Sequence, residues 1–184
     1  MRITGVVLKG RFIKVPDGII RPAMDRMRES IFAVLGDITG LSFLDIFSGS
    51  GIIALEAASR GAYYIEAVEQ DKGKGKTLLE NVSISPVRIN CRFMPAELYV
   101  KRAGNKKNFD IIFLDPPFPY QFKWELITSI AESALAQNGS KLLIHRPKED
   151  MPPINIQFLE KTDTREYGRS FVDFFIVRKE LPIL

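Results

Sequence analysis

The chain has 184 residues, of which 46% are hydrophobic and 10% aromatic, and its formal net charge is +4. This composition can bury an apolar core, which excludes an intrinsically disordered protein and suffices for about one domain of 100 to 200 residues. No apolar run reaches the roughly 20 residues that cross a bilayer, and the N-terminus lacks the hydrophobic stretch of a signal peptide, so we expect a soluble, cytoplasmic protein without membrane contact.

The first segment of the chain is strongly basic. Residues 1–28 contain seven Lys and Arg side chains against two Asp, whereas the rest of the chain is almost neutral. Such a segment can hold a polyanion through its phosphates, although a solvated charged surface explains the pattern equally well. Residues 2–16 predict a small hairpin, and residues 25–35 predict a helix. The apolar face of that helix is expected to comprise Met27, Ile31, Val34 and Leu35.

Beyond this arm, runs that suit buried strands alternate with runs of helical spacing. Strands are expected at 41–47, 62–69, 88–93, 109–115 and 140–145, and helices at 52–60, 77–82, 96–102 and 124–136. This alternation predicts a mainly parallel sheet with helices on both faces. After Pro147, two strands at 154–161 and 171–179, separated by TDTREYG, predict an antiparallel pair at the sheet edge. We expect one domain over 1–184, with an arm and helix at 1–36 and the core at 41–184.

The first chemical motif is LDIFSGSGIIALEAASRG, a strand that ends in a glycine turn and opens a helix. Gly49 and Gly51 allow a sharp turn and a close approach of the backbone to a ligand. The spacing of Gly49, Gly51 and Ala54 also satisfies the fingerprint of dinucleotide sites, so the motif alone does not distinguish NAD from another nucleoside cofactor. An ordinary tight turn is the structural alternative.

The second motif is Glu69, which ends the second core strand in the run EAVEQD. An acidic side chain at this place in a doubly wound sheet can accept hydrogen bonds from both hydroxyls of a ribose. Glu69 therefore favours a nucleoside ligand, with an exposed strand-end glutamate as the alternative.

The third motif, Asp115-Pro116-Pro117-Phe118, follows the strand at 109–115 and is the most specific signal in the chain. Two prolines make a rigid loop without N–H donors. A base amino group is a poor nucleophile, and hydrogen bonds from its protons to the Asp115 carboxylate and the Pro116 carbonyl would direct its lone pair at a methyl donor. Phe118 would stack on the base.

In this order and spacing, DIFSGSG, VEQD and DPPF resemble the amino-methyltransferases that act on DNA or RNA bases. The segments KVPDGIIRPAMDRMRESIFAVL and REYGRSFVDFF extend the resemblance, over almost the whole chain, to the RsmD family of bacterial small-subunit rRNA guanine-N2 methyltransferases. The resemblance implies an α/β, seven-stranded, Rossmann-like class I fold with a short N-terminal hairpin and helix. It also implies S-adenosylmethionine as the donor, S-adenosylhomocysteine as the product, and a guanine of 16S rRNA, within an assembling 30S subunit, as the substrate.

The resemblance also assigns site residues. It gives the donor site to Asp45, Phe47, Gly49, Gly51, Glu69, Gln70 and Ala96, with Glu69 on the ribose. The target base is assigned to the loop from Asp115 to Phe118. Three positions depart from the family pattern. Ala23 follows Pro22 where the family usually has a Thr whose hydroxyl could cap the next helix. Ala96 lies where an Asp is common near the adenine, and His145, the only histidine, lies where the family tends to carry Glu. We interpret His145 as a strand-end residue and not as a general base.

The arginines of the N-terminal helix are assigned to substrate RNA. Arg21, Arg26 and Arg28 would meet phosphates beside a flipped-out base. In the alternative, one of them holds Asp25, Glu29 or the carboxylate of the donor.

Three further alternatives remain at this point. An NAD-linked oxidoreductase would explain the glycine turn and Glu69 but would leave the Asp115 loop idle. A DNA adenine-N6 methyltransferase shares that loop, and a noncatalytic RNA-binding assembly factor could retain the fold. We expect no metal, because the sequence contains nothing that resembles a ligand set, and we expect a monomer.

Overall fold

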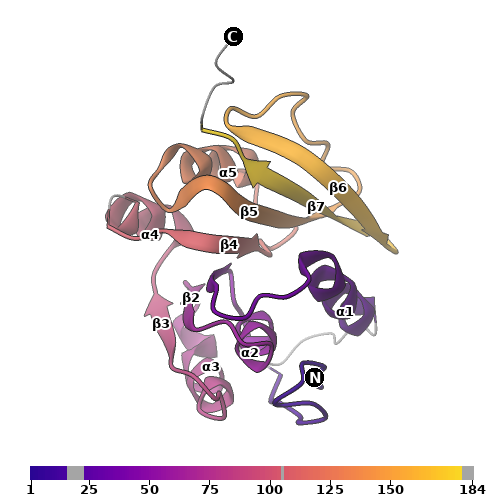
Figure 1. Ribbon diagram of the computed structural model, residues 1–184, viewed down its shortest axis with the longest axis vertical. Coiled ribbons are helices and arrows are strands. Elements are labelled where there is room, and N and C mark those ends of the chain that lie inside the picture. Colours follow the sequence, from indigo (N-terminus) through magenta and orange to yellow (C-terminus); the bar gives the residue numbers. More distant parts are fainter. Residues whose placement is uncertain (16–22, 105, 180–184) are drawn as a thin grey trace.

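The computed structural model describes residues 1–15, 23–104 and 106–179. Within them, seven strands form one sheet in the order β3-β2-β1-β4-β5-β7-β6 (Figure 1). The strands are β1 (Ser42–Ile46), β2 (Tyr64–Glu69), β3 (Ile89–Phe93), β4 (Phe109–Leu114), β5 (Ala136–Pro147), β6 (Leu159–Tyr167) and β7 (Ser170–Val177). Strands β1 to β5 are parallel, and β7 is antiparallel to both β5 and β6. The predicted seven-stranded α/β sheet with an antiparallel closing pair is confirmed.

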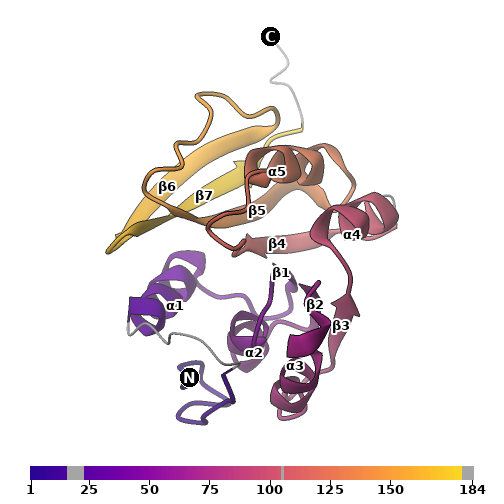
Figure 2. The same cartoon turned by 180° about the vertical axis from the view of Figure 1, so that it is seen from behind.

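Helices cover both faces of this sheet (Figures 1 and 2). On one face lie α1 (Ala23–Leu35), α2 (Ile52–Ser59) and α3 (Gly75–Val82), and on the other lie α4 (Ala96–Ala103) and α5 (Lys123–Glu132). Strand β1 is buried along its whole length, with Phe43 in the core on the α1 and α2 side and Leu44 in the core on the α4 and α5 side. Consecutive strand residues point to opposite faces, so a strand covered on both faces is buried at every position and is mostly apolar.

The strand order places a topological switch at β1. This strand pairs with β2 on one side and with β4 on the other, so the connections leave in opposite directions. In open α/β sheets the crevice at such a point, outside the carboxyl ends of the strands, is where ligands bind. Glu69 at the end of β2 and Asp115 directly after β4 both belong to this edge.

The N-terminal segment folds as a loose hairpin that docks on α2. Arg2 and Phe12 form an isolated antiparallel bridge, and the Ile3 N–H donates to the Arg11 carbonyl at 2.9 Å. The Gly5 N–H donates to Glu56 Oε2 at 2.8 Å, which anchors the hairpin to a buried carboxylate of α2. The expected hairpin is thereby observed over the residues that the structure describes.

The closing hairpin differs from the prediction at its first strand. We predicted a strand at 154–161 with residues 162–168 as the connection, whereas β6 runs from Leu159 to Tyr167 and turns at Gly168. β6 is an edge strand, and most of its side chains are exposed. Its run of polar residues therefore resembles a loop in sequence, although its backbone pairs with β7.

The end of α5 and the buried face of α1 also differ from the prediction. Helix α5 ends at Glu132 and not at Ala136, because the Ala134 N–H already donates to the Gly104 carbonyl and Ala136 begins β5. On α1, Val34 is 37% exposed, and Phe32, at 2%, lies in the core instead. The remaining predicted apolar positions of this helix are buried as expected.

Candidate active site

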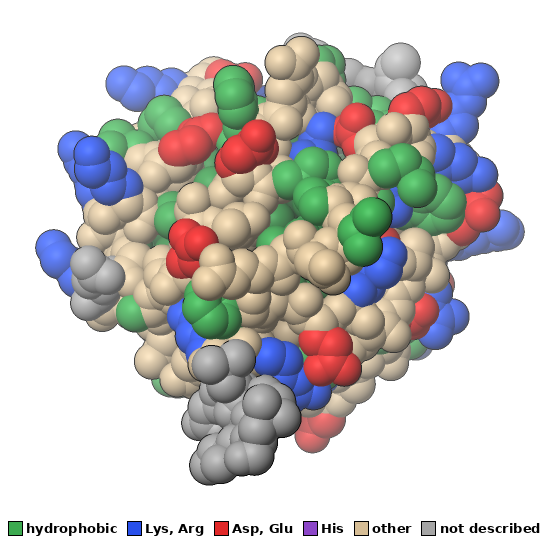
Figure 3. Space-filling view, turned by 90° about the horizontal axis from the view of Figure 1, so that it is seen from above, with side chains coloured by type: hydrophobic (Ala, Val, Ile, Leu, Met, Phe, Trp, Pro, Cys, Tyr) green, Lys and Arg blue, Asp and Glu red, His purple; other side chains and the backbone are tan. Residues whose placement is uncertain are grey.

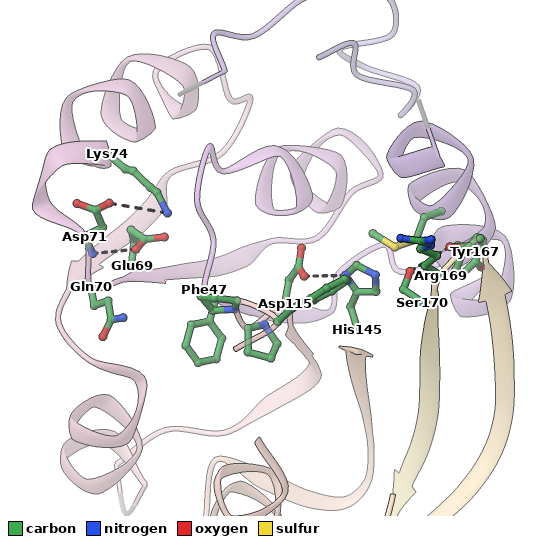
Figure 4. Close-up of a pocket in the computed structure, with 15 residues that line it drawn as sticks. Phe47, Glu69, Gln70, Asp71, Lys74, Asp115, His145, Tyr167, Arg169 and Ser170 are labelled. Carbon is green, nitrogen blue, oxygen red and sulfur yellow. Dashed lines mark hydrogen bonds and ion pairs between the residues drawn. The ribbon is translucent and has the colours of Figure 1, made fainter. Parts of the chain in front are cut away.

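A pocket of about 800 Å³ opens at the carboxyl edge of the sheet (Figure 4). Its wall includes the end of β2, the loop after β4, the end of β5, the turn between β6 and β7, and one residue of α1. The lining residues are Met27, Phe47, Glu69, Gln70, Asp71, Lys74, Asp115, Pro116, Pro117, Phe118, His145, Tyr167, Gly168, Arg169 and Ser170. Residues of all three sequence motifs therefore line one cavity, although the first motif contributes only Phe47.

The glycine turn between β1 and α2 has the backbone that its sequence predicts. Phe47, Gly49 and Gly51 all have positive φ, at 66°, 54° and 79°. A Cβ on Gly51 would lie 2.6 Å from the Leu78 side chain, so both the φ angle and the close approach require glycine there. Gly51 also caps α2, whose eight residues are all buried.

Glu69 connects this turn, by hydrogen bonds, to the turn that follows β2. Its Oε2 atom accepts a hydrogen bond from the Gly49 N–H at 2.8 Å, and its Oε1 atom accepts one from the Asp71 N–H at 2.8 Å. The residue is 5% exposed and lines the pocket beside Gln70, Asp71 and Lys74 (Figure 4). Each carboxylate oxygen retains a further lone pair for a ligand.

Asp45 lies behind the pocket wall. It is 1% exposed, and its Oδ2 atom accepts a hydrogen bond from the Ala54 N–H at 3.2 Å. Burial raises the pKa of Asp45 well above its usual range, and the negative charges of Asp115 and Glu69 raise it further. Among the described residues, the lining contains Phe47, Glu69 and Gln70 of the predicted donor residues but not Asp45, Gly49, Gly51 or Ala96.

The loop from Asp115 to Phe118 forms the middle of the pocket wall. The Asp115 N–H donates to the Ile46 carbonyl at 3.2 Å, which holds the start of the loop beside β1. All four residues line the pocket, and Phe118 is 36% exposed. The structure thus brings the Asp115 carboxylate and an aromatic ring to the same cavity as Glu69.

His145 is a pocket residue that the sequence interpretation underrated. It lies in β5, is 7% exposed, and its Nδ1 atom is 2.7 Å from Asp115 Oδ1. Its ring meets that of Phe118 edge-on at a centroid separation of 5.6 Å. The pairing of parallel β4 and β5 brings the two strand ends together, which no local sequence signal reveals.

The far end of the pocket is formed by α1 and the turn between β6 and β7. Tyr167 Oη donates a hydrogen bond to Ser30 Oγ at 2.6 Å, which joins the turn to α1. Met27 lines the pocket from α1. Arg169, which is exposed in the turn, lines it beside Tyr167 and Ser170 (Figure 4). This end therefore combines an exposed cation with apolar surface.

The three arginines assigned to RNA differ in exposure and in their contacts. Arg21 lies outside the described residues, and Arg26 is exposed on α1. Arg28 is 1% exposed and contacts the Arg2 carbonyl at 2.8 Å, Asp25 at 2.9 Å and Glu56 at 3.5 Å. The expectation that Arg28 faces the catalytic mouth was wrong, because the buried carboxylate of Glu56 on α2 draws its guanidinium inward.

Three further observations concern charge, metal ligands and membrane spans. On the face that Figure 3 shows, Lys and Arg side chains are scattered among acidic and hydrophobic ones. The described part of the chain contains no group of three His, Cys, Asp or Glu side chains that could hold a metal ion. Nor does any helix in that part have the length and apolarity to cross a membrane.

Comparisons with known proteins agree with the geometry. A family model described as conserved hypothetical protein 95 matches residues 1–176. Ribosomal RNA small subunit methyltransferase D of Escherichia coli K12 is 35% identical over 155 residues, which cover 83% of this chain and 78% of that protein. A solved structure of a hypothetical protein of Thermus thermophilus has a TM-score of 0.82 at 29% identity and covers 96% of this chain and 99% of its own.

The fold is shared more widely. The crystal structure of SMU.776, a protein complexed with S-adenosylhomocysteine, has a TM-score of 0.70 at 18% identity and covers 88% of this chain and 52% of its own. At that identity the likeness concerns the fold alone, which is the class I methyltransferase fold.

Proposed function

The chain belongs to the RsmD family, and from this membership we propose that it transfers a methyl group from S-adenosylmethionine to the N2 amino group of a guanine in 16S ribosomal RNA. The observation that carries the proposal is the convergence of Glu69, the Asp115–Phe118 loop and the glycine turn at one pocket edge. The family membership also argues against an NAD-linked oxidoreductase.

The end of the pocket at Glu69 suits the nucleoside part of the donor. Glu69 is held by two backbone N–H groups and keeps lone pairs for ribose hydroxyls. Phe47 and Gln70 line the same end, and Gly49 and Gly51 shape the turn behind it. The donor supplies a methyl group bound to a positively charged sulfur.

The loop after β4 suits the acceptor amine. Asp115 and the Pro116 carbonyl would each accept one amino proton, which directs the nitrogen lone pair away from the loop. Phe118 would stack against the base. As the nitrogen gains the methyl group it must lose one proton, and the Asp115 carboxylate is placed to accept it and release it to water.

The RNA strand is proposed to approach at the far end of the pocket. Arg169, exposed in the turn after β6, and Arg26, exposed on α1, are the described candidates for phosphate contacts. We do not assign Arg28 this role, because its side chain is buried. A cytoplasmic monomer that acts on an assembling 30S subunit remains our expectation.

The test is transfer of radiolabel from S-adenosylmethionine to defined substrates. Undermethylated 30S subunits, free 16S rRNA and duplex DNA are offered in parallel, and digests are analysed for the labelled nucleoside. Label in N2-methylguanosine supports the proposal. Label in N6-methyladenine of DNA would favour the alternative activity that shares the Asp115 loop.

A further inference from the structure

His145 contacts both ends of the Asp115–Phe118 loop. Its Nδ1 atom lies 2.7 Å from Asp115 Oδ1 (Figure 4), and its ring packs edge-on against Phe118 at 66° between the ring planes. The two prolines between these residues have fixed φ angles. One side chain of β5 therefore touches the first and the last residue of a stiff loop.

The direction of the hydrogen bond follows from its partners. An ionised carboxylate only accepts, so Nδ1 of His145 carries the hydrogen and donates it to Asp115 Oδ1. His145 Nε2 is buried and has no hydrogen-bond partner in the part of the chain that the structure describes. The contact with Asp115 is thus the polar interaction that fixes the orientation of this ring.

The hydrogen bond from His145 acts on the Asp115 carboxylate, which in the proposed reaction accepts a hydrogen bond from the acceptor amine. With Oδ1 occupied by His145, rotation of the Asp115 carboxylate is limited and Oδ2 is left for the incoming amino proton. The Asp115 N–H is also bonded to the Ile46 carbonyl, so both backbone and side chain are fixed. A displacement of about 1 Å at such a group can lower a rate about 100-fold.

We propose that His145 is a positioning residue, which acts on the acceptor base through Asp115 and Phe118 and does not itself exchange a proton with the substrate. The inference rests on the proposed methyl transfer. It differs from the strand-end interpretation of the sequence, because it assigns His145 a role in the rate of transfer and none in donor binding.

Two amide substitutions separate positioning from packing. In His145→Asn the side-chain amide can place a donor near the position of Nδ1, whereas in His145→Gln the donor lies nearer that of Nε2. We expect His145→Asn to keep kcat within about threefold of the wild type and His145→Gln to lose about 10-fold to 100-fold. His145→Leu, which has no donor, should lose as much as His145→Gln.

The measurements are kcat and KM for methylation of undermethylated 30S subunits, with S-adenosylhomocysteine affinity by calorimetry and melting temperature as controls. The KM for 30S subunits and the S-adenosylhomocysteine affinity should stay within about twofold of the wild type in all three variants. A wild-type kcat in His145→Gln, or equal losses in His145→Asn and His145→Gln, would overturn the inference.

Failure of the inference can be told from failure of the proposed function. Asp115→Asn is assayed beside the His145 variants. If Asp115→Asn loses transfer while His145→Gln and His145→Leu retain it, the proposed function stands and only the role of His145 is wrong. If the wild-type protein methylates none of the 16S rRNA, the proposed function is wrong and the inference falls with it.

Discussion

The carboxylate of Glu69 accepts a hydrogen bond from the Gly49 N–H at 2.8 Å, so the end of β2 is bonded to the turn that follows β1. The other oxygen accepts from the Asp71 N–H, which opens the next turn. A single buried side chain thereby joins two turns beside the end of the pocket that we propose for the donor. Its loss should affect both ligand affinity and local structure.

Glu69→Ala should weaken S-adenosylhomocysteine binding by about 1.5–3 kcal/mol, because a charge-assisted acceptor is removed. Calorimetry on the folded variant measures this. Glu80→Ala, on the exposed surface of α3, is the matched control and should bind as the wild type does. Tight binding of NAD, together with no binding of S-adenosylhomocysteine by the wild type, would refute the assignment of this end of the pocket.

Phe118→Ala should lower kcat/KM for methylation by about 5-fold to 150-fold, the equivalent of about 1–3 kcal/mol of stacking on a base. Phe122→Ala is the control, since Phe122 is 62% exposed and is not among the pocket residues. Steady-state kinetics with 30S subunits compare the two. Equal effects of both substitutions would contradict a stacking role for Phe118.

Arg169→Gln should flatten the salt dependence of RNA binding by roughly 0.7 in log–log slope, as expected for one phosphate contact with a single strand. The base that is methylated should stay the same. Binding of an RNA fragment is measured over a range of salt concentrations, with Arg102→Gln on α4 as the control. An unchanged slope in Arg169→Gln would place the RNA contact elsewhere.

Arg28→Gln should lower the stability of the folded protein and leave its affinity for RNA unchanged. Removing one partner of a buried ion pair costs about 3–5 kcal/mol, and Arg28 is 1% exposed against Glu56 at 0%. Chemical denaturation should show the loss of stability. If the variant keeps wild-type stability but loses RNA affinity, Arg28 binds RNA after all.

Asp45→Asn should stabilise the protein at neutral pH. Because burial and the nearby Asp115 raise the pKa of Asp45, the folded state holds its proton up to a higher pH than the unfolded chain does. The stability from this group is fully present below about pH 3.9, the ordinary pKa, and is lost as pH rises through the raised value. The melting temperatures of the variant and the wild type should therefore diverge as pH rises from about 4 to about 8, and parallel curves would contradict this.

The sequence predicts the inner part of this fold well because burial on both faces leaves a strong signal. Strands β1 and β4 are mostly apolar and almost wholly buried, and the residue directly after each strand, Phe47 or Asp115, belongs to a motif. β6 leaves no such signal, since its exposed side chains are polar and its backbone pairing is set by β7. The boundary of that strand therefore could not be read from the chain alone.

In the candidate site, too, some residues could be identified from the sequence and others could not. The glycine turn, Glu69 and the Asp115 loop are local motifs and could be identified by their residues. The bond between His145 and Asp115 joins residues 30 positions apart, and that between Arg28 and Glu56 joins residues 28 positions apart. Both depend on the packing of neighbouring elements, so these two contacts could not be read from the sequence. The contact between Arg28 and Asp25, three positions apart, was among the alternatives that the sequence offered.

Methyl transfer by Asp115→Asn, compared with the wild type on undermethylated 30S subunits, tests the proposed function most directly. The substitution removes one carboxylate acceptor while S-adenosylhomocysteine binding and melting temperature serve as controls. We expect labelled N2-methylguanosine in 16S rRNA from the wild type and a rate lower by about 100-fold or more from the variant. Wild-type transfer by Asp115→Asn would contradict the mechanism proposed for this site.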